Sequence, residues 1–339
     1  MEICIDGRLI GPSHKPYVIA ECADAHMGSM DYAKALVRMA ATCGADAVKF
    51  QHHLPDEEML PDSGPLADNL PEEGLYQWLK DHALTLDQHR ELKKFCIQEG
   101  ITYLCTPFSW KAAQEINDLV PAFKIGSGEA QDFPTLDNIM RLGKPMIVST
   151  GMCTEKEVIS LVEYLPRSTI FMHCVSEYPP HTQDLNVYWL KELECYCDIY
   201  GYSSHYPLIH DSVMAMGLGA SVIEKHVTLS HHAYGPDKDV SIGEEDLRTL
   251  CEAASVAQYA RGSNLGKNIH KLEEPVRAWA YRSLVITKPV KAGNPITKDA
   301  IWSKRPGTGI PAKEMHNYID RLAKLDIPAN TMLTEEMLQ

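Results

Sequence analysis

Two lysines lie inside otherwise apolar stretches, Lys49 in AVKFQ and Lys124 in FKIGS. Burying an ammonium group is costly unless an opposite charge accompanies it, so each lysine needs an internal carboxylate or a bound anion. Hydroxyl groups at comparable places, Thr106, Ser127 and Ser149, add hydrogen-bond donors. These groups suit a ligand that carries a phosphate and a carboxylate, and an internal ion pair is the alternative.

Two histidines and two carboxylates end other short runs. His205 closes GYSSH and His226 closes SVIEKH, while Glu21 ends YVIAE and Glu224 lies in EKH. A matched pair of imidazoles can bind a divalent metal ion, although a lone histidine more often packs in a core. The carboxylates are candidates for proton transfer, for bonding a sugar hydroxyl or for pairing with a lysine.

These residues occupy the same place in a repeating pattern, in which short apolar runs end in polar residues and alternate with segments of helical period. The runs are Tyr17–Glu21, Ala45–Gln51, Ile101–Thr106, Ala122–Ser127, Pro145–Thr150, Thr169–Cys174, Ile199–Ser203 and Ser221–His226. Eight strand–helix units in about 250 residues indicate an α/β fold of the (β/α)8 TIM-barrel type. An open doubly wound sheet would have fewer strands and a Gly-rich first turn.

Active sites of this barrel gather at the C-terminal ends of the strands. The pattern therefore predicts that one set of polar side chains converges there. The set is Glu21, Lys49, Gln51, Thr106, Lys124, Ser127, Glu129, Ser149, Thr150, His173, Ser203, His205, Glu224 and His226.

Three further segments depart from the repeat. A hairpin is expected at Ile3–Ile5 and Arg8–Ile10 around Asp6-Gly7. The acidic stretch between Gln51 and Asp87 is expected to be a solvated loop that acts as a lid or a dimer contact. His52 and His53 at its start, like His231 and His232 later, are expected to face solvent.

The last part of the chain contains a short internal repeat, VKAGNPITKDAI at Val290–Ile301 and IPANTMLTEEML at Ile327–Leu338. Each copy reads as a strand, a turn and a Thr-capped helical turn. We therefore expect a barrel domain with its hairpin over residues 1–261, a linker over 262–280 and a small mixed domain with a pseudo-twofold over 281–339.

Composition excludes several classes of function. The net charge of −14 argues against nucleic-acid binding. The ten cysteines include no C-x-x-C and are expected to be free thiols. No apolar run reaches the roughly 20 residues of a membrane helix, and MEICIDGRLIG is not a secretory signal. We expect a cytoplasmic protein that binds neither membrane nor nucleic acid.

A series of motifs resembles the sialic acid synthase family over nearly the whole chain. In order, they are IAECADAHMGS, GADAVKFQ, TPFS, KIGSGE, GKPMIVSTGM, HCVSEYP, GYSSH, EKH, GPD and KRPGTG. The C-terminal repeat resembles the antifreeze-like (SAF) domain of that family. The resemblance implies a transferase that condenses phosphoenolpyruvate with an N-acylated aminohexose to a nine-carbon keto acid and phosphate.

The resemblance also implies roles for individual residues. Glu21 matches a catalytic carboxylate, and His205 and His226 match ligands of Mn²⁺ or Mg²⁺. The phosphoenolpyruvate set comprises Lys49, Thr106, Lys124, Ser127 and Ser149, and the sugar-facing set comprises Gln51, Glu129, Tyr178, Asp237 and Arg305. Arg305 matches the arginine that the small domain of a homodimer sends into the partner's barrel.

The chain departs from the family pattern at Ala25, Ser176, Ser204 and Lys238. These changes concern the sugar pocket and the surroundings of the metal ligands. The acceptor is accordingly N-acetylmannosamine or a diacetamido-trideoxy hexose. A non-catalytic or altered sugar-binding relative, for example in spore-coat polysaccharide formation, is one alternative, and a Schiff-base aldolase using Lys49 or Lys124 is another.

Overall fold

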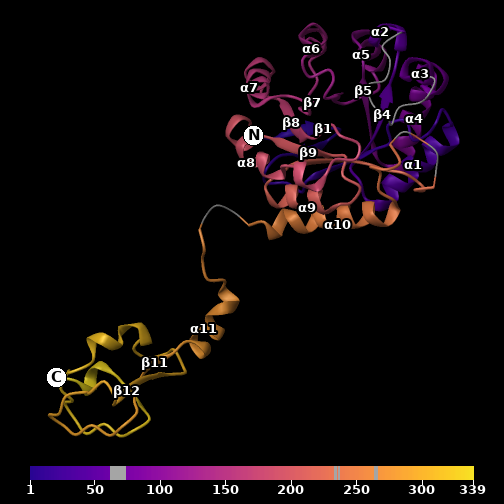
Figure 1. Ribbon diagram of the computed structural model, residues 1–339. Helices are drawn as coiled ribbons and strands as arrows, with labels where there is room; N and C mark the ends of the chain where they lie inside the picture. Colours follow the sequence, from indigo (N-terminus) through magenta and orange to yellow (C-terminus); the bar gives the residue numbers. More distant parts are fainter. Residues whose placement is uncertain (62–73, 233–234, 236, 263–265) are drawn as a thin grey trace. The chain divides into compact units, whose positions relative to one another are not determined.

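The structure is a computed structural model that describes residues 1–61, 74–232, 235, 237–262 and 266–339. The chain divides into two compact units, Met1–Gly262 and Ser263–Gln339. Each unit has its own core, and each is described below by itself (Figure 1).

Eight parallel strands form the sheet of the first unit, which confirms the predicted α/β barrel. Their bounds are β3 (Tyr17–Glu21), β4 (Ala47–His52), β5 (Thr102–Pro107), β6 (Phe123–Ile125), β7 (Met146–Ser149), β8 (Thr169–Cys174), β9 (Tyr200–Ser204) and β10 (Val222–His226). The order is β5-β4-β3-β10-β9-β8-β7-β6, and β5 and β6 at its two ends lie within contact of each other. The sheet therefore curves into a nearly closed barrel.

Helices surround this barrel, as the βαβ pattern predicts (Figure 1). They are α1 (Met30–Cys43), α2 (Pro55–Glu58), α3 (Leu75–His82), α4 (Leu86–Glu99), α5 (Trp110–Ile116), α6 (Phe133–Met140), α7 (Glu155–Tyr164), α8 (Leu190–Tyr196), α9 (His210–Gly217) and α10 (Glu244–Ala260), with 3-10 turns η1 (Thr182–Asp184) and η2 (Val187–Trp189).

Local sequence signals define several helix ends. The Ser29 side chain accepts from the backbone of Tyr32 at the start of α1, and Gly44 ends that helix at φ 86°. Thr85 with Gln88, and Thr154 with Glu157, form reciprocal capping boxes on α4 and α7. These side chains and the glycine therefore define where α1, α4 and α7 begin or end.

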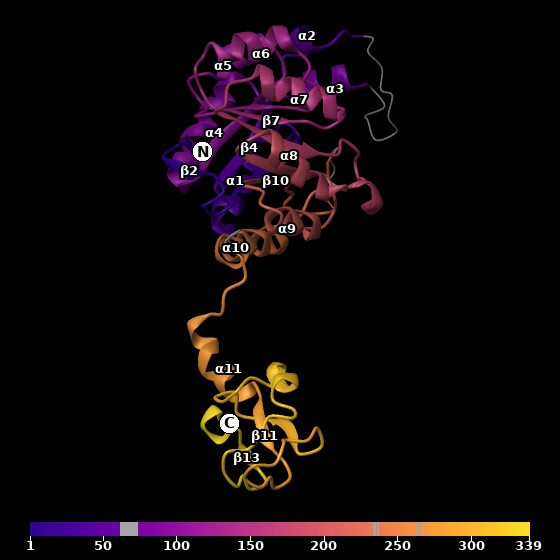
Figure 2. The same ribbon diagram turned by 90° about the vertical axis from the view of Figure 1, so that its left-hand side faces the viewer.

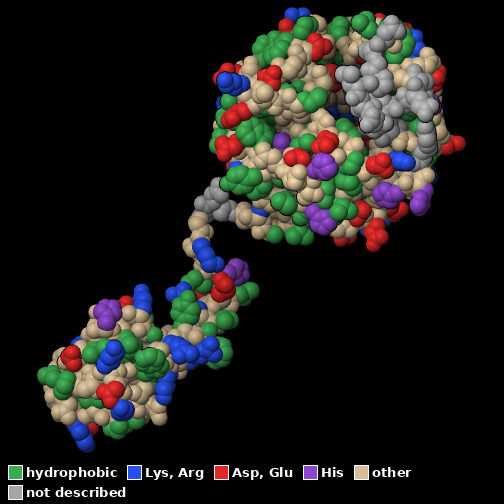
Figure 3. Space-filling model, in the orientation of Figure 1, with side chains coloured by type: hydrophobic (Ala, Val, Ile, Leu, Met, Phe, Trp, Pro, Cys, Tyr) green, Lys and Arg blue, Asp and Glu red, His purple; other side chains and the backbone are tan. Residues whose placement is uncertain are grey.

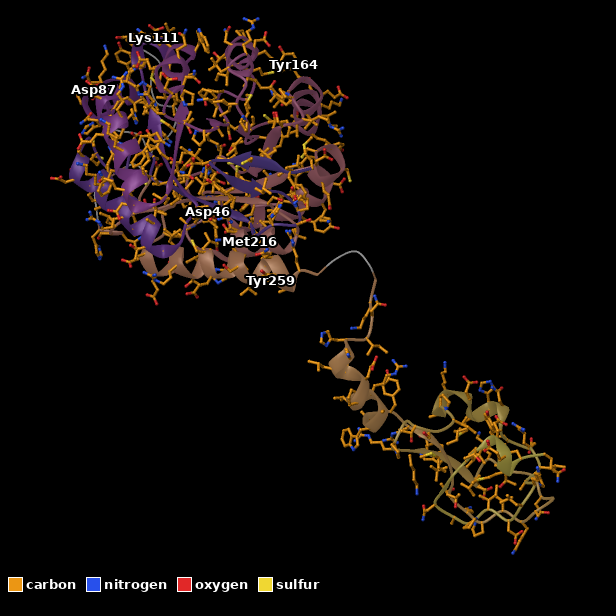
Figure 4. All side chains as sticks on the ribbon, turned by 180° about the vertical axis from the view of Figure 1, so that it is seen from behind. Asp46, Asp87, Lys111, Tyr164, Met216 and Tyr259 are labelled. Atoms are coloured by element: carbon orange, nitrogen blue, oxygen red, sulfur yellow. The ribbon has the colours of Figure 1, made fainter. Side chains whose placement is uncertain are left out.

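The N-terminal hairpin closes one end of the barrel. Strands β1 (Ile3–Ile5) and β2 (Arg8–Ile10) pair in antiparallel fashion. Their isoleucines pack against inward-facing apolar residues of the barrel strands, including Ile19, Leu104 and Ile147. Nearby, Asp46 (labelled in Figure 4) accepts from the backbone N–H of Val18 at 2.8 Å. This end is thus a packed core, which leaves the opposite end for chemistry.

The connection after β4 differs from the solvated loop that we expected. It contains α2 and α3, and Trp78 and Leu79 of α3 are buried. Its residues 62–73 lie outside the described part of the chain, so its predicted roles as a lid or dimer contact stay predictions. The apolar face of α3 covers part of the barrel, because burying its leucine and tryptophan side chains removes apolar surface from water.

The second unit is built on a small antiparallel sheet ordered β12-β11-β13 (Figure 2). Its elements are η3 (Lys271–Glu273), α11 (Glu274–Ala280), β11 (Ser283–Ile286), β12 (Ile301–Lys304), η4 (Ala312–Asn317), β13 (Thr331–Met332) and η5 (Glu335–Met337). Part of the predicted linker is therefore helical.

The two copies of the internal repeat meet in this unit. Val290 and Ile327, the first residues of the copies, exchange backbone hydrogen bonds of 2.9 and 2.8 Å. The second copy forms a 3-10 turn after Thr334, whereas the first forms only a turn after Thr297. A reciprocal pairing supports the expected pseudo-twofold, although the helical turn occurs in one copy only.

Across the described residues, no helix combines the length and apolar character needed to cross a membrane.

Candidate active site at the barrel mouth

The C-terminal ends of the barrel strands surround a cavity of about 340 Å³. Every side chain of the predicted strand-end set lines it except Thr150 and His173. Those two instead donate to backbone carbonyls, of Met172 and Leu185 respectively, each at 3.0 Å. The strand-end rule therefore finds nearly the whole site, because parallel strands of a barrel all end at the same face.

This cavity is here called the cationic chamber. Its floor contains two lysines and two carboxylates. Lys49 forms an ion pair with Glu21, and its ammonium lies 3.7 Å from Glu224. Lys124 lies 3.5 Å from the same Glu224 oxygen. All four side chains are at least 95% buried. The internal ion pairs are therefore present, and both lysines also line the cavity, so anion binding by them stays a prediction.

Hydroxyl groups extend this chamber. Lys49 donates to Thr106 Oγ1 at 2.9 Å, and Lys124 donates to Ser149 Oγ at 2.8 Å. The Ser127 hydroxyl accepts from the backbone N–H of Gly151 at 3.1 Å. A Cβ at Gly151 would lie 2.7 Å from that hydroxyl, so glycine is required where the backbone approaches it. The result is a cradle of cations, hydroxyls and backbone suited to an anion's oxygens.

Burial and the neighbouring lysines shift the pKa values of Glu21 and Glu224 in opposite directions. Burial raises the pKa of Glu21, even though Lys49 lies beside it. Burial also acts to raise the pKa of Glu224, but Lys124 and Lys49 outweigh it and the pKa is lowered. Glu224 is therefore the ionised partner of both lysines, and Glu21 is the carboxyl that can exchange a proton near neutral pH.

His205 and His226 face each other on the next side of the cavity, with ring centroids 5.3 Å apart. His205 Nδ1 donates to the Val175 carbonyl at 2.7 Å, so its Nε2 carries a lone pair and accepts from the Tyr178 hydroxyl at 2.9 Å. Burial, followed by the nearby positive charges, lowers the pKa of His226 well below its usual value. Burial acts to lower the pKa of His205, but the neighbouring Cys174 outweighs it and the pKa is raised. Two adjacent imidazoles, once unprotonated, have the chemistry of a divalent-ion site.

Within the described residues, no third His, Cys, Asp or Glu joins this pair in a metal-binding group. The remaining coordination positions of an ion held there would belong to water or substrate oxygens. An open site of this kind suits catalysis better than structural support. Two imidazoles with open positions for oxygen ligands can hold a divalent ion.

A buried network lies behind the histidine pair. Ser204, which precedes His205, donates to Asp211 at 2.6 Å, and Tyr202 donates to the same carboxylate oxygen at 3.0 Å. Lys225, which precedes His226, donates to Ser204 Oγ at 2.9 Å. The residues before the two histidines are thus bonded to each other. Asp211 on α9 supplies the carboxylate of this network.

A second cavity of about 390 Å³ adjoins the first. The two share Gln51, Phe108, Glu129, Tyr178 and His226. The second, here called the acidic chamber, is also lined by Asp24, His53, Glu58, Met59, Leu75, Trp78, Leu79 and Asp237.

His53 corrects our expectation that His52 and His53 are solvated. His53 is 7% exposed, stacks on Phe108 at 4.2 Å and bonds to Glu58 and Gln51 at 3.0 Å. His52 is 1% exposed and bonds to Glu115 at 2.9 Å. Strand β4 ends at His52, and the extended chain just beyond it places His53 beside Gln51. His231 and His232 are exposed, as expected.

Two carboxylic acids of the acidic chamber are strongly affected by burial. Burial raises the pKa of Glu129 to about 7 and that of Asp237 to about 6. Glu129 Oε2 is buried without a hydrogen-bond partner among the described residues. Asp237 Oδ2 lies 3.7 Å from His226 Nδ1. Both acids can accept hydrogen bonds from an incoming hydroxyl or amide N–H.

Other predicted or notable residues lie elsewhere. Arg305 belongs to the second unit, where its Nε donates to the Ala280 carbonyl at 3.0 Å and its guanidinium lies 4.6 Å from the Trp279 ring centroid. Ser176 lines the cationic chamber and Lys238 is exposed.

Sequence reasoning missed the apolar residues of the acidic chamber, because Leu75, Trp78 and Leu79 come from a connection without strand periodicity. Their helical spacing of three and four residues was the available signal.

Comparisons with known proteins agree with this arrangement. The NeuB family model matches residues 36–265, and the SAF domain model matches residues 281–339. An uncharacterized protein of Methanocaldococcus jannaschii is 34% identical over 96% of this chain and 95% of its own length. The N,N'-diacetyllegionaminic acid synthase of Campylobacter jejuni is 32% identical over 95% of this chain and 99% of its own.

The human N-acetylneuraminate-9-phosphate synthase is 30% identical over 100% of this chain and 96% of its own length. Among solved structures, the N-acetylneuraminic acid synthetase of Leptospira borgpetersenii superimposes with a TM-score of 0.75 over 81% of this chain and 95% of its own, at 24% identity. That likeness concerns the fold.

Proposed function

The chain belongs to the NeuB family, and we propose that it joins phosphoenolpyruvate to the open-chain form of an N-acylated aminohexose. The products are a nine-carbon keto acid of the sialic acid type and inorganic phosphate. One observation carries this proposal: a chamber with two lysines and several hydroxyls opens, past His226 and Tyr178, onto a chamber rich in hydrogen-bond acceptors.

The reaction balances without any further reactant. The π electrons of phosphoenolpyruvate form a bond from its C3 to the aldehyde carbon, and the aldehyde oxygen takes up a proton. Water adds at C2 and loses a proton. The bond from C2 to the phosphate oxygen then breaks, the remaining hydroxyl loses its proton, and a keto group and phosphate result.

The residues of the cationic chamber hold and orient the first substrate in this proposal. Lys49 and Lys124 neutralise the phosphate and carboxylate, and Thr106, Ser127 and Ser149 bond their oxygens. Glu21, whose pKa is raised, takes the proton that leaves as water adds at C2. Holding both reactants face to face supplies much of the rate enhancement.

The acceptor occupies the acidic chamber. Gln51, Glu129, Tyr178 and Asp237 bond its hydroxyl and amide groups. A divalent ion held by His205 and His226 would polarise the aldehyde as a Lewis acid.

The proposed assembly is a homodimer in which the second unit of each copy supplies Arg305 to the partner's acidic chamber. Charge supports it: residues 263–339 contain 12 Lys and Arg against 8 Asp and Glu, whereas the whole chain has 32 against 46. Figure 3 shows these basic side chains on the surface of the smaller unit. Opposite charges favour the association of a basic unit with an acidic barrel.

Phosphate release tests the function directly. Metal-free protein is given phosphoenolpyruvate, Mn²⁺ and each candidate sugar in turn. Release that requires both the ion and a sugar supports the proposal, and release with no combination contradicts it.

Mixing two inactive variants, Lys124→Met and Arg305→Ala, tests the dimer. About a quarter of the wild-type activity should return if each site takes its arginine from the other copy. Mixtures that stay inactive, with subunit exchange shown by mass, would count against the shared site.

A further inference from the structure

A chain of hydrogen bonds runs from helix α2 to the proton-exchanging carboxyl Glu21. Glu58, the last residue of α2, meets His53 Nδ1 with both carboxylate oxygens, at 3.0 and 3.1 Å. His53 Nε2 lies 3.0 Å from Gln51 Oε1, and Gln51 Nε2 lies 3.5 Å from Glu21 Oε1. The proposed reaction uses Gln51 and Glu21 but assigns nothing to Glu58 and His53.

The acceptors along this chain determine where its protons lie. A carboxylate only accepts hydrogen bonds, so His53 Nδ1 donates to Glu58. Glu21 Oε1 already accepts from the backbone N–H of Ala23 at 2.7 Å, so the amide of Gln51 turns its NH2 group toward that oxygen. The Gln51 oxygen then faces His53 and needs a donor, because the opposite amide orientation would place two acceptor oxygens together. His53 therefore carries a proton on both ring nitrogens.

The surroundings of His53 support a cation at this position. The side chains of His53 and Glu58 are 6% and 5% exposed, and the imidazole stacks on Phe108 with ring centroids 4.2 Å apart. Asp24 Oδ2 lies 3.6 Å from His53 Nε2, and Glu129 adds a more distant negative charge. Burial acts to lower the pKa of His53, but the hydrogen bond to Glu58 and the charge of Asp24 outweigh it and the pKa is raised.

We propose that His53 is a positioning residue for Gln51 and, through Gln51, for Glu21. His53 holds the amide oxygen of Gln51, which leaves one amide N–H for Glu21 Oε1 and the other for an oxygen of the acceptor sugar. Gln51 lines both chambers, so a fixed amide sets the carboxyl and the sugar in one arrangement. Glu58 keeps His53 in its charged form. This inference rests on the proposed function, whose supporting residues it names.

Two substitutions of His53 separate its two hydrogen bonds. His53→Gln can place an amide N–H where Nε2 donates to Gln51, whereas His53→Asn reaches only the position of Nδ1. kcat for phosphate release should fall about tenfold in His53→Asn and stay within about threefold of the wild type in His53→Gln, because only the first loses a hydrogen bond in the chain to a charged group. KM for phosphoenolpyruvate should change by less than about twofold in both, since Lys49 and Lys124 are unchanged. Equal losses of kcat in the two variants overturn the proposal.

His52→Asn is the matched control for a purely structural role. His52 is also buried, but it bonds to Glu115 and lines neither chamber. Its substitution should lower the melting temperature, as His53→Asn does, and leave kcat within about twofold of the wild type. A loss of kcat that follows the melting temperature in all three variants would show that His53 only stabilises the fold, and so overturns the proposal.

Nitrogen NMR of protein with isotope-labelled histidine shows the protonation of His53 without turnover. At about pH 7.5, where an unperturbed histidine is mostly neutral, both ring nitrogens of His53 should carry protons. Glu58→Gln should leave the ring with one proton, and Glu57→Gln, at an exposed neighbour on α2, should not.

The same measurement separates this inference from the proposed function. A neutral His53 in the wild-type protein overturns the inference, whether or not phosphate is released. A doubly protonated His53, with no phosphate release from any sugar, overturns the proposed function and supports the charged, fixed His53.

Discussion

The two chambers at the barrel mouth differ in charge although they share a wall. The cationic chamber has Lys49 and Lys124 at its floor, each near Glu224, and hydroxyls above them. The acidic chamber has carboxylic acids with raised pKa values and an apolar wall. This difference supports the proposed binding of an anionic reactant beside a hydroxyl-rich one, because the carboxylates of the acidic chamber repel an anion and accept hydrogen bonds from hydroxyl groups.

The shared wall is where the two reactants would meet. His226 and Tyr178 line both chambers, and His205 faces them from the cationic side. A change at this wall should affect both substrates, whereas a change deep in either chamber should affect one. The following predictions use that distinction.

The largest effect is expected at the shared wall. His226→Ala should lower phosphate release by about 1,000-fold or more, since it removes half of the protein ligands of the proposed ion. Removing the ion from the wild-type protein with a chelator should have the same effect, and adding Mn²⁺ back should restore activity to the wild type only. The control His232→Ala, at an exposed position, should remain active. Chelator-resistant turnover would contradict the metal role.

A change at the floor should affect one chamber. Lys124→Met should weaken phosphoenolpyruvate binding by about 30-fold or more, because truncating one partner of a buried charged contact costs about 2–5 kcal/mol of binding free energy. Sugar binding, measured by calorimetry, should stay within about twofold. The matched control is Lys111→Met at an exposed lysine. Equal losses for both ligands would show that the chambers are not independent.

The network behind the histidines should have a moderate effect. Asp211→Asn should lower the affinity for Mn²⁺ by about 10- to 100-fold, because partners of ligand-bearing residues orient them. Binding of phosphoenolpyruvate in the absence of the ion should not change. Asp198→Asn, at a partly exposed surface carboxylate, is the control. A lower melting temperature with unchanged affinity for the ion would show that Asp211 stabilises the fold and does not position the histidines.

The smallest effect concerns pH. Burial raises the pKa of Glu129 to about 7, and a charge-assisted hydrogen bond is about twice as strong as a neutral one. kcat/KM for the sugar should therefore rise about three- to tenfold as the pH increases through 7. Glu21, whose pKa burial also raises to about 7, should add a step to the profiles of both substrates, so the Glu129 step is the excess seen with the sugar. Glu129→Gln should remove it, and the exposed control Glu163→Gln should not.

The free energy of unfolding should also depend on pH through Glu129. The folded-state pKa of Glu129 lies above the unfolded value, so its contribution to stability is present at low pH and is lost as the pH rises from about 4.5 to 7. Glu129→Gln should accordingly raise the free energy of unfolding more at pH 8 than at pH 5. Denaturant unfolding at the two pH values measures this difference.

Much of the fold could be predicted from local patterns. The boundaries of β3 and β8 coincide with the predicted runs, because β-branched stretches act over a few residues. The connection after β4 could not be predicted in this way. Trp78 and Leu79 are buried against surfaces that come from distant parts of the chain. The acidic composition of the connection, taken alone, predicted a solvent-exposed loop.

The sequence alone establishes the barrel and the set of residues at its mouth. Strand periodicity is local, and parallel strands necessarily end together, so Lys49, Lys124, His205 and His226 had to converge.

Distances and pairings across the mouth depend on how the strands curve and how the helices pack. The bond from Lys225 to Ser204, the approach of Asp211 from α9 and the burial of His53 arise from that packing. So does the division into two chambers, because residue spacing along one chain does not determine which side chains of different elements meet.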